Sequence, residues 1–167
     1  MILDMSIQAF TVLHVIISLI AIVSGLVVVA GMVSANPRPG WTALFLLTTV
    51  LTSLTGFLFP IRGFTPALGT GAVSSVILVI ALIALYGKHL TGAWRWIYVV
   101  AAITALYLNV LVLIVQSFQK VPFLHPLAPT QTSEPPFLIA QSVALGLFVL
   151  LGIAAVIKFR PGAARPA

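Results

Sequence analysis

The chain has 167 residues, of which 61% are hydrophobic and 6% are charged. An ordinary soluble domain carries roughly 25% charged residues, and eight basic and two acidic side chains cannot cover the surface of a chain this long. The composition therefore excludes a water-soluble globular protein and predicts an exterior in contact with lipid.

The formal net charge of +6 comes from basic residues that stand one or two at a time at the ends of apolar stretches. This placement is typical of membrane topology signals, so we expect a lipid bilayer and no nucleic acid as partner. Cysteine is absent, which excludes disulfides, thiolate catalysis and cysteine-based metal centres.

Five apolar stretches reach, or nearly reach, the roughly 20 residues that a helix needs to cross a hydrocarbon core. They cover residues 7–33, 41–59, 66–87, 93–118 and 136–159. Prolines and glycines between them end the helices, since proline lacks a backbone donor and glycine lacks restraint. We predict an all-α integral membrane protein, a single domain over residues 1–167 that forms a bundle of five transmembrane helices. Threonine, serine and glycine dilute the second and third stretches, so a bundle of four is the alternative.

The basic residues are distributed unevenly between the two ends of the predicted bundle. The side of the amino terminus receives Arg62 and Lys120, and the other side receives Arg38, Lys88, Arg95, Lys158, Arg160 and Arg165. Because cytoplasmic loops are enriched in Lys and Arg, this bias predicts an outward amino terminus and a cytoplasmic carboxyl terminus. A bundle of four helices would not keep this uneven distribution of basic residues between the two sides.

The first stretch carries its polar residues on one narrow face. His14 is followed at helical spacing by Ser18, Ala21 and Gly25. Small residues allow close approach between membrane helices. This face is therefore expected to meet another helix.

Polar side chains inside the other stretches gather in the same half of the membrane as His14. A pocket open to the outer face is the functional hypothesis, since polar groups are costly in a bilayer and tend to be functional. Its predicted cover is the proline-rich loop 119–135. The candidate residues are His14, Thr52, Thr55, Asn109, Gln116, Gln141, His125 and Glu134.

A structural role is the competing interpretation of these residues. An intramembrane His or Gln often bonds a neighbouring helix, which contributes about 1 kcal/mol. Threonine hydroxyls such as those of Thr52 and Thr55 commonly bond back to their own helix and bend it.

Histidine suggests haem or copper as an alternative. His14 and His125 are the only pair that can share one metal ion, and they can do so only if the outer loop folds inward. His89, beside Lys88, is expected at a helix end on the opposite face. We therefore expect no cofactor, with a haem- or copper-binding redox protein as the alternative.

Signatures of catalysis are missing from the sequence. The two carboxylates, Asp4 and Glu134, both lie outside the apolar stretches, and no phosphate-binding loop or zinc-protease motif is present. We predict a non-enzymatic binding or assembly role, either holding a small ligand near the outer leaflet or packing in a homo-oligomer or larger complex. A small solute channel lined by Thr52, Thr55, Ser74, Ser75 and Asn109 is the other alternative.

The fourth stretch and the loop after it carry the most distinctive pattern. Its segments are Gly92 to Tyr98, Ala105 to Val110, Gln116 to Pro122, Ala128 to Gln131 and Ser133 to Phe137. The pattern resembles a group of small, uncharacterised bacterial multi-pass membrane proteins, over most of the chain from His14 onward. The resemblance implies a bacterial inner membrane; the group has no established activity, so no site residue carries over.

Overall fold

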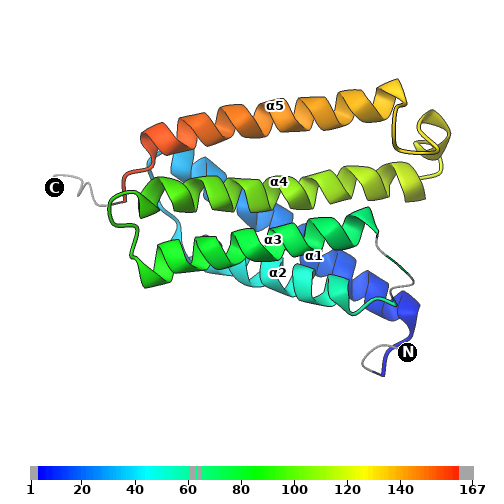
Figure 1. Ribbon diagram of the computed structural model, residues 1–167, viewed down its shortest axis with the longest axis horizontal. Helices are drawn as coiled ribbons and strands as arrows, with labels where there is room; N and C mark the ends of the chain where they lie inside the picture. Colours follow the sequence, from blue (N-terminus) through cyan, green and yellow to red (C-terminus); the bar gives the residue numbers. More distant parts are fainter. Residues whose placement is uncertain (1–3, 61–62, 64, 162–167) are drawn as a thin grey trace.

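The computed structural model describes residues 4–60, 63 and 65–161, and these residues form an all-α bundle (Figure 1). Its helices are α1 (Ile7–Val33), α2 (Pro39–Phe57), α3 (Pro66–Leu82), α4 (Trp94–Lys120) and α5 (Pro135–Lys158). A π-helical turn, η1 (Ile83–Gly87), extends α3, and a short 3-10 turn, η2 (His125–Leu127), lies between α4 and α5.

All five helices are long and apolar enough to cross a membrane, counting α3 together with η1. The predicted five-helix bundle is thereby confirmed. Its outer surface matches hydrocarbon, because side chains such as Val76, Ile139 and Leu150 are more than 60% exposed. We describe the chain as a multi-pass membrane protein.

The helix boundaries agree with the sequence prediction to within two residues when η1 is counted with α3. α2 begins at Pro39 because proline is well placed in the first turn of a helix, where its missing donor costs nothing. α4 continues to Lys120, so the loop between α4 and α5 starts at Val121. α5 begins with the pair Pro135 and Pro136.

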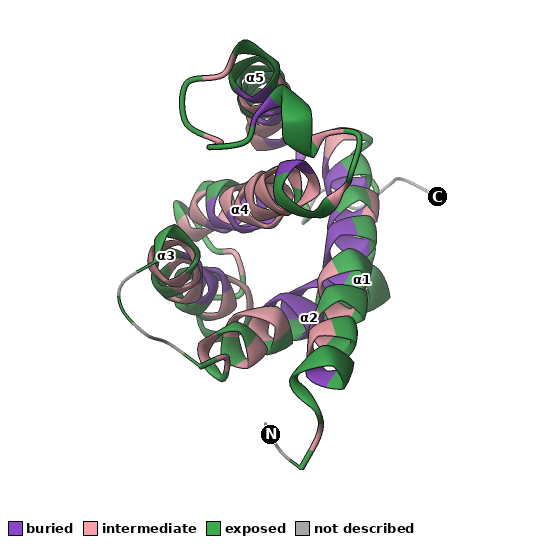
Figure 2. Cartoon of the chain, turned by 90° about the vertical axis from the view of Figure 1, so that its right-hand side faces the viewer, coloured by how far each residue is buried: buried purple, intermediate pink, exposed green. Residues whose placement is uncertain are grey.

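Consecutive helices run antiparallel, and the two termini lie at opposite ends of the bundle (Figure 1). Viewed from the end that carries the amino terminus, α1, α2, α3 and α4 form a ring, and α5 packs outside it against α4 (Figure 2). The ring and the outlying fifth helix are the two parts of the architecture.

The core fills only one half of the ring. Buried side chains of α1, α2, α3 and α4 meet toward the end away from the amino terminus, over residues 22–32, 45–49, 74–81 and 98–106. Gly25 marks the closest approach: a Cβ there would lie 2.6 Å from Leu106 Cδ1 and 2.9 Å from the Phe45 ring. The face of α1 that contains Ser18, Ala21 and Gly25 therefore meets neighbouring helices, as predicted.

The loop between α4 and α5 packs on the ends of those two helices. Ala128 is fully buried against Phe118 of α4 and Phe137 of α5, whose rings lie edge to face with centroids 5.7 Å apart. Apolar side chains thus anchor this loop over α4 and α5, and of its predicted residues only Lys120 and Val121 line the cavity described below.

Arg95 joins the start of α4 to the end of α5. Its Nη1 donates to the carbonyl oxygens of Val156 (2.9 Å) and Phe159 (2.6 Å). These carbonyls belong to the last turn and C-cap of α5, where a cation also complements the helix dipole. Arg95 thus has a structural role besides its place in the charge pattern. Arg62 and Arg165, also in that pattern, lie outside the described residues.

Candidate functional site

A cavity of about 600 Å³ occupies the half of the ring that the core leaves open. Its walls come from residues 11–22 of α1, 52–57 of α2, 67–74 of α3, 108–120 of α4, and Val121, which follows α4. Phe59, Pro60 and Thr65 border it at the end of the bundle seen in Figure 2. Its volume is in the range of small-molecule sites.

Small side chains explain why the cavity exists. On α2 the lining includes Thr52, Ser53 and Gly56, and on α3 it includes Gly71 and Ser74. These residues cannot fill the space that the leucines and phenylalanines fill in the other half of the ring. The same threonines, serines and glycines that weakened the second and third stretches in the sequence therefore create the cavity.

His14 lines the cavity, and Thr55 holds its ring. The His14 Nδ1 and Thr55 Oγ1 atoms are 2.7 Å apart, and the Thr55 hydroxyl itself donates to the Leu51 carbonyl at 2.7 Å. The Thr55 hydroxyl therefore links the imidazole to the backbone of α2. The Phe59 ring packs edge-on against the imidazole, with centroids 5.4 Å apart.

Three buried polar atoms in the cavity wall have no hydrogen-bond partner among the described residues. They are Ser74 Oγ, Asn109 Nδ2 and Gln116 Oε1. Most other helix hydroxyls donate to their own backbone; the neighbouring Ser75, for example, donates to Gly71 at 2.8 Å. Buried polar groups are normally satisfied. Tyr98 Oη and Gln141 Oε1, outside the cavity, are also unpaired among the described residues, but only the cavity wall brings three such atoms to one site.

The open end of the cavity is electropositive. Lys120, at the last position of α4, lines it, as do Thr65 and Ala67 at the start of α3. Thr65 caps α3 by accepting from Leu68 N–H at 3.2 Å. A helix amino terminus carries partial positive charge, so it adds to the charge of Lys120.

The cavity gathers only part of the predicted site. His14, Thr52, Asn109 and Gln116 line it, and Thr55 contacts His14 from behind. The remaining candidates, Gln141, His125 and Glu134, are not among its lining residues. Gln141 instead donates to the Leu111 carbonyl at 3.3 Å and links α5 to α4.

His125 lies in η2 with its Nδ1 3.2 Å from the Phe118 carbonyl oxygen. The loop between α4 and α5 therefore faces α4 at this histidine rather than folding into the ring. In the described part of the chain, no group of three or more His, Cys, Asp or Glu side chains is placed to hold a metal ion. His89 sits in the turn before α4 with a positive φ of 47°, at the opposite end from His14.

Glu134 forms its hydrogen bonds within the loop between α4 and α5. Its carboxylate accepts from Thr130 Oγ1 (2.5 Å), Thr130 N–H (2.8 Å) and Thr132 N–H (3.0 Å). These donors, the Thr130 hydroxyl first, lower the pKa of Glu134 to about 2. The two prolines that follow leave no N–H in the first positions of α5 for this side chain to cap, so it is free to organise the loop.

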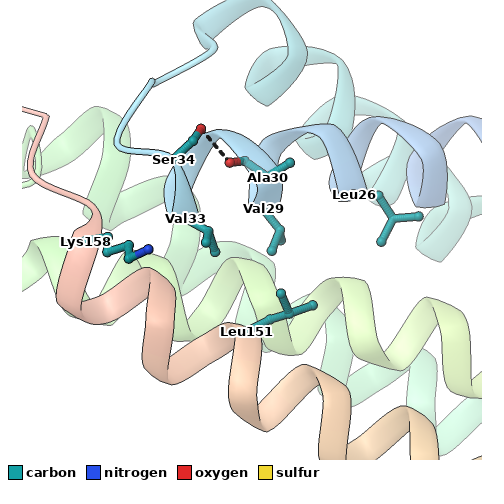
Figure 3. Close-up of a pocket in the computed structure, with 7 residues that line it drawn as sticks. All are labelled: Leu26, Val29, Ala30, Val33, Ser34, Leu151 and Lys158. Atoms are coloured by element: carbon teal, nitrogen blue, oxygen red, sulfur yellow. Dashed lines mark hydrogen bonds between the residues drawn. The ribbon is translucent and has the colours of Figure 1, made fainter.

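A second hollow lies between α1 and α5 at the other end of the bundle. Val29 and Val33 of α1 and Leu151 of α5 point into this groove, and Lys158 lies at one end of it (Figure 3). Ser34, its other polar residue, already donates to the Ala30 carbonyl at 2.7 Å. None of the unpaired buried atoms belongs to this groove, so the cavity inside the ring is the better candidate.

Reasoning from sequence missed the part that Lys120 and Ser53 play in the cavity, and it considered Ser74 only for the channel alternative. Lys120 was assigned to topology, although it follows Asn109 by eleven residues and Gln116 by four, which is one helical stripe. That spacing could have placed it with the polar candidates.

The chain was compared with protein-family models, curated proteins and solved structures, and none of the three comparisons gave a match.

Proposed function

We propose that this protein is a non-enzymatic binding protein of a bacterial inner membrane that holds a small, largely apolar molecule inside the ring of α1 to α4. The observation that carries the proposal is the grouping of Ser74 Oγ, Asn109 Nδ2 and Gln116 Oε1, all unpaired, in one cavity of about 600 Å³. A mainly apolar wall with a few fixed polar atoms is typical of ligand pockets.

Binding is better supported than catalysis or passage through the membrane. The described lining contains one imidazole and no carboxylate, so a general acid and base pair is not assembled there. Below the floor, Phe45, Leu78 and Leu106 are at most 2% exposed and close the ring. A solute entering the cavity therefore meets packed hydrocarbon rather than a continuous polar path.

We propose that the end of the bundle with the cavity faces outward. The basic residues Arg38, Lys88, Arg95, Lys158 and Arg160 cluster at the end of the bundle away from the cavity mouth. The positive-inside rule then makes that end cytoplasmic and opens the cavity to the outer leaflet. The amino terminus is outward in this arrangement.

An assembly role is the second candidate function. In the most apolar stretch of α5 only 17% of the residues are buried inside the protein, against 39% in that of α4. Its exposed face could bind a second copy or another membrane protein as well as lipid.

Native mass spectrometry of the protein released from host membranes tests both candidates. We expect a retained small molecule in the wild type, and its loss when Asn109 and Gln116 are both replaced by leucine. The Gln141→Leu variant is the matched control, because Gln141 is an amide outside the cavity. A wild type that carries nothing, or equal retention in all three proteins, contradicts ligand binding; a mass of more than one chain supports assembly.

A further inference from the structure

The polar groups of the cavity lie at two depths along α4. Asn109 is at the floor and Lys120 is at the mouth, eleven residues or about 16 Å apart along the helix. Ser74 is a second floor group, eight residues or about 12 Å from the first residue of α3. A ligand that fills the cavity meets both levels.

The mouth is suited to an acidic group. Lys120 and the amino-terminal end of α3 border it, and Ala67 N–H lies in the first turn, where a helix leaves its donors without partners. Neither carboxylate of the chain lines the cavity, and Glu134 is held by Thr130 and Thr132. The positive charge at the mouth therefore has no acidic partner within the described lining.

The floor is suited to a neutral polar group. Ser74 is 4% exposed, and among the described residues neither its hydroxyl nor Asn109 Nδ2, from the same lining, has a hydrogen-bond partner. An ion at this depth would have no opposite charge to compensate its desolvation. A hydroxyl or carbonyl group can satisfy both residues without that cost.

The wall between the two levels is mainly aliphatic, with Leu19, Ile22 and Val112 among its residues. An apolar chain is therefore the fitting link between the two polar ends. We propose that the ligand is an amphiphile with an acidic group at Lys120 and a neutral hydroxyl or carbonyl group at Asn109 and Ser74. This inference rests on the proposed function and names its ligand class.

The inference excludes two simpler ligands. An ordinary single-headed fatty acid satisfies Lys120 but leaves Ser74 and Asn109 facing methylene groups. A neutral alcohol satisfies the floor but leaves the charge of Lys120 without a counterion.

Three probes of equal length separate these possibilities: lauric acid, ω-hydroxylauric acid and dodecanediol. An extended twelve-carbon chain spans about 14 Å by ordinary bond geometry, which is close to the distance between mouth and floor. Binding is measured by retention of each probe on protein in lipid nanodiscs, with empty nanodiscs as the blank. We expect the hydroxy acid to bind about tenfold more tightly than either other probe.

Two variants test which residue binds each end of the ligand. Lys120→Gln should lower the affinity for both acids about tenfold and leave that for dodecanediol unchanged. Asn109→Leu should lower the affinity for the hydroxy acid and the diol about fivefold and leave that for lauric acid unchanged. Lys158→Gln and Gln141→Leu are the controls, since neither residue lines this cavity, and both should bind all probes as the wild type does.

Equal affinities for the three probes, or variants without selective effects, overturn the inference and leave the proposed function standing. Absence of binding by all three probes also overturns it. In that case the retained molecule seen by native mass spectrometry still decides the proposed function independently.

Discussion

The amide of Asn109 is the single residue at which ligand binding and structural support make opposite predictions. Its Nδ2 atom is buried without a partner among the described residues, and the residue lines the cavity. If it were structural, its replacement would lose an interhelical bond worth about 0.6 to 2 kcal/mol.

We predict that Asn109→Leu leaves the free energy of unfolding of the ligand-free protein unchanged or raises it. The reason is that the substitution removes an unsatisfied polar group and adds apolar volume to the wall. Reversible unfolding in mixed micelles measures this free energy. Ser74→Ala and Ser75→Ala form a second pair of variants for the same comparison. Only Ser75 has a hydrogen bond to lose. A drop above about 1 kcal/mol for Asn109→Leu assigns it to packing.

Glu134 should make the outer loop sensitive to acid but not to neutral pH. Its pKa falls from an ordinary value of 4.5 to about 2 in the folded protein. A carboxyl with a depressed folded pKa stabilises the fold above its unfolded pKa, and this contribution is lost as the pH falls toward the folded pKa. The loop should therefore hold its order from neutral pH to about 4.5 and loosen progressively between 4.5 and 2.

The carboxyl NMR shift of Glu134 reports this titration directly. Thr130→Val removes the hydroxyl donor that is the largest cause of the low pKa, and the midpoint should move upward. A midpoint near 4.5 in the wild type would show that these hydrogen bonds do not persist in the membrane.

At the scale of the helices, the end of α5 depends on a side chain from α4. Arg95 donates to two carbonyls of the final turn and cap of α5, Val156 and Phe159. Hydrogen bonds to a charged group contribute about 1.5 to 3 kcal/mol. We predict that Arg95→Leu lowers the free energy of unfolding by about 2 kcal/mol and increases amide exchange in the last turn of α5. Arg160→Leu removes a positive charge at the same end of the bundle. A similar loss of unfolding free energy in that variant would show that charge, rather than the Arg95 hydrogen bonds, causes the effect.

The contact of α1 with α2 and α4 depends on a glycine. A methyl group at Gly25 would lie 2.6 Å from Leu106 and 2.9 Å from Phe45, both buried in the core. Overpacking of this kind costs about 1 to 3 kcal/mol, so Gly25→Ala should destabilise the bundle by that amount. Gly146 of α5 has open space at the corresponding position, and Gly146→Ala should be neutral or stabilising. Equal effects of the two substitutions would remove the case for close packing at Gly25.

The helices were predictable from sequence, and their lateral arrangement was not. Residues 7–33 were predicted and found as one helix because length and hydropathy alone decide whether a segment spans the membrane. The place of α5 outside the ring depends instead on contacts such as Tyr107 with Phe148 and Arg95 with Phe159, which link positions far apart in the sequence. Helix periodicity says which face is polar but not which neighbour that face meets.

The candidate site shows the same division. Asn109 and Gln116 were predicted as pocket residues from their place in the fourth stretch, and both line the cavity. His125 and Glu134 were grouped with them only because the loop follows α4 in the sequence. The burial of Ala128 between Phe118 and Phe137 draws that loop toward α5, and no local pattern in the loop reveals this choice.

The orientation of the whole molecule decides which leaflet the cavity serves. Because the chain has no cysteine, single cysteines introduced at exposed turns report their compartment to an impermeant maleimide. Ser133 lies in the loop between α4 and α5, and Asn36 lies in the turn between α1 and α2, at the other end of the bundle. We predict that Ser133→Cys is labelled in intact cells and that Asn36→Cys is labelled only after permeabilisation. The reverse pattern would open the cavity to the cytoplasmic leaflet, so that acidic amphiphiles would have to reach Lys120 from inside the cell. Labelling of both positions from one side would contradict an odd number of crossings, because five antiparallel helices place these two turns on opposite faces.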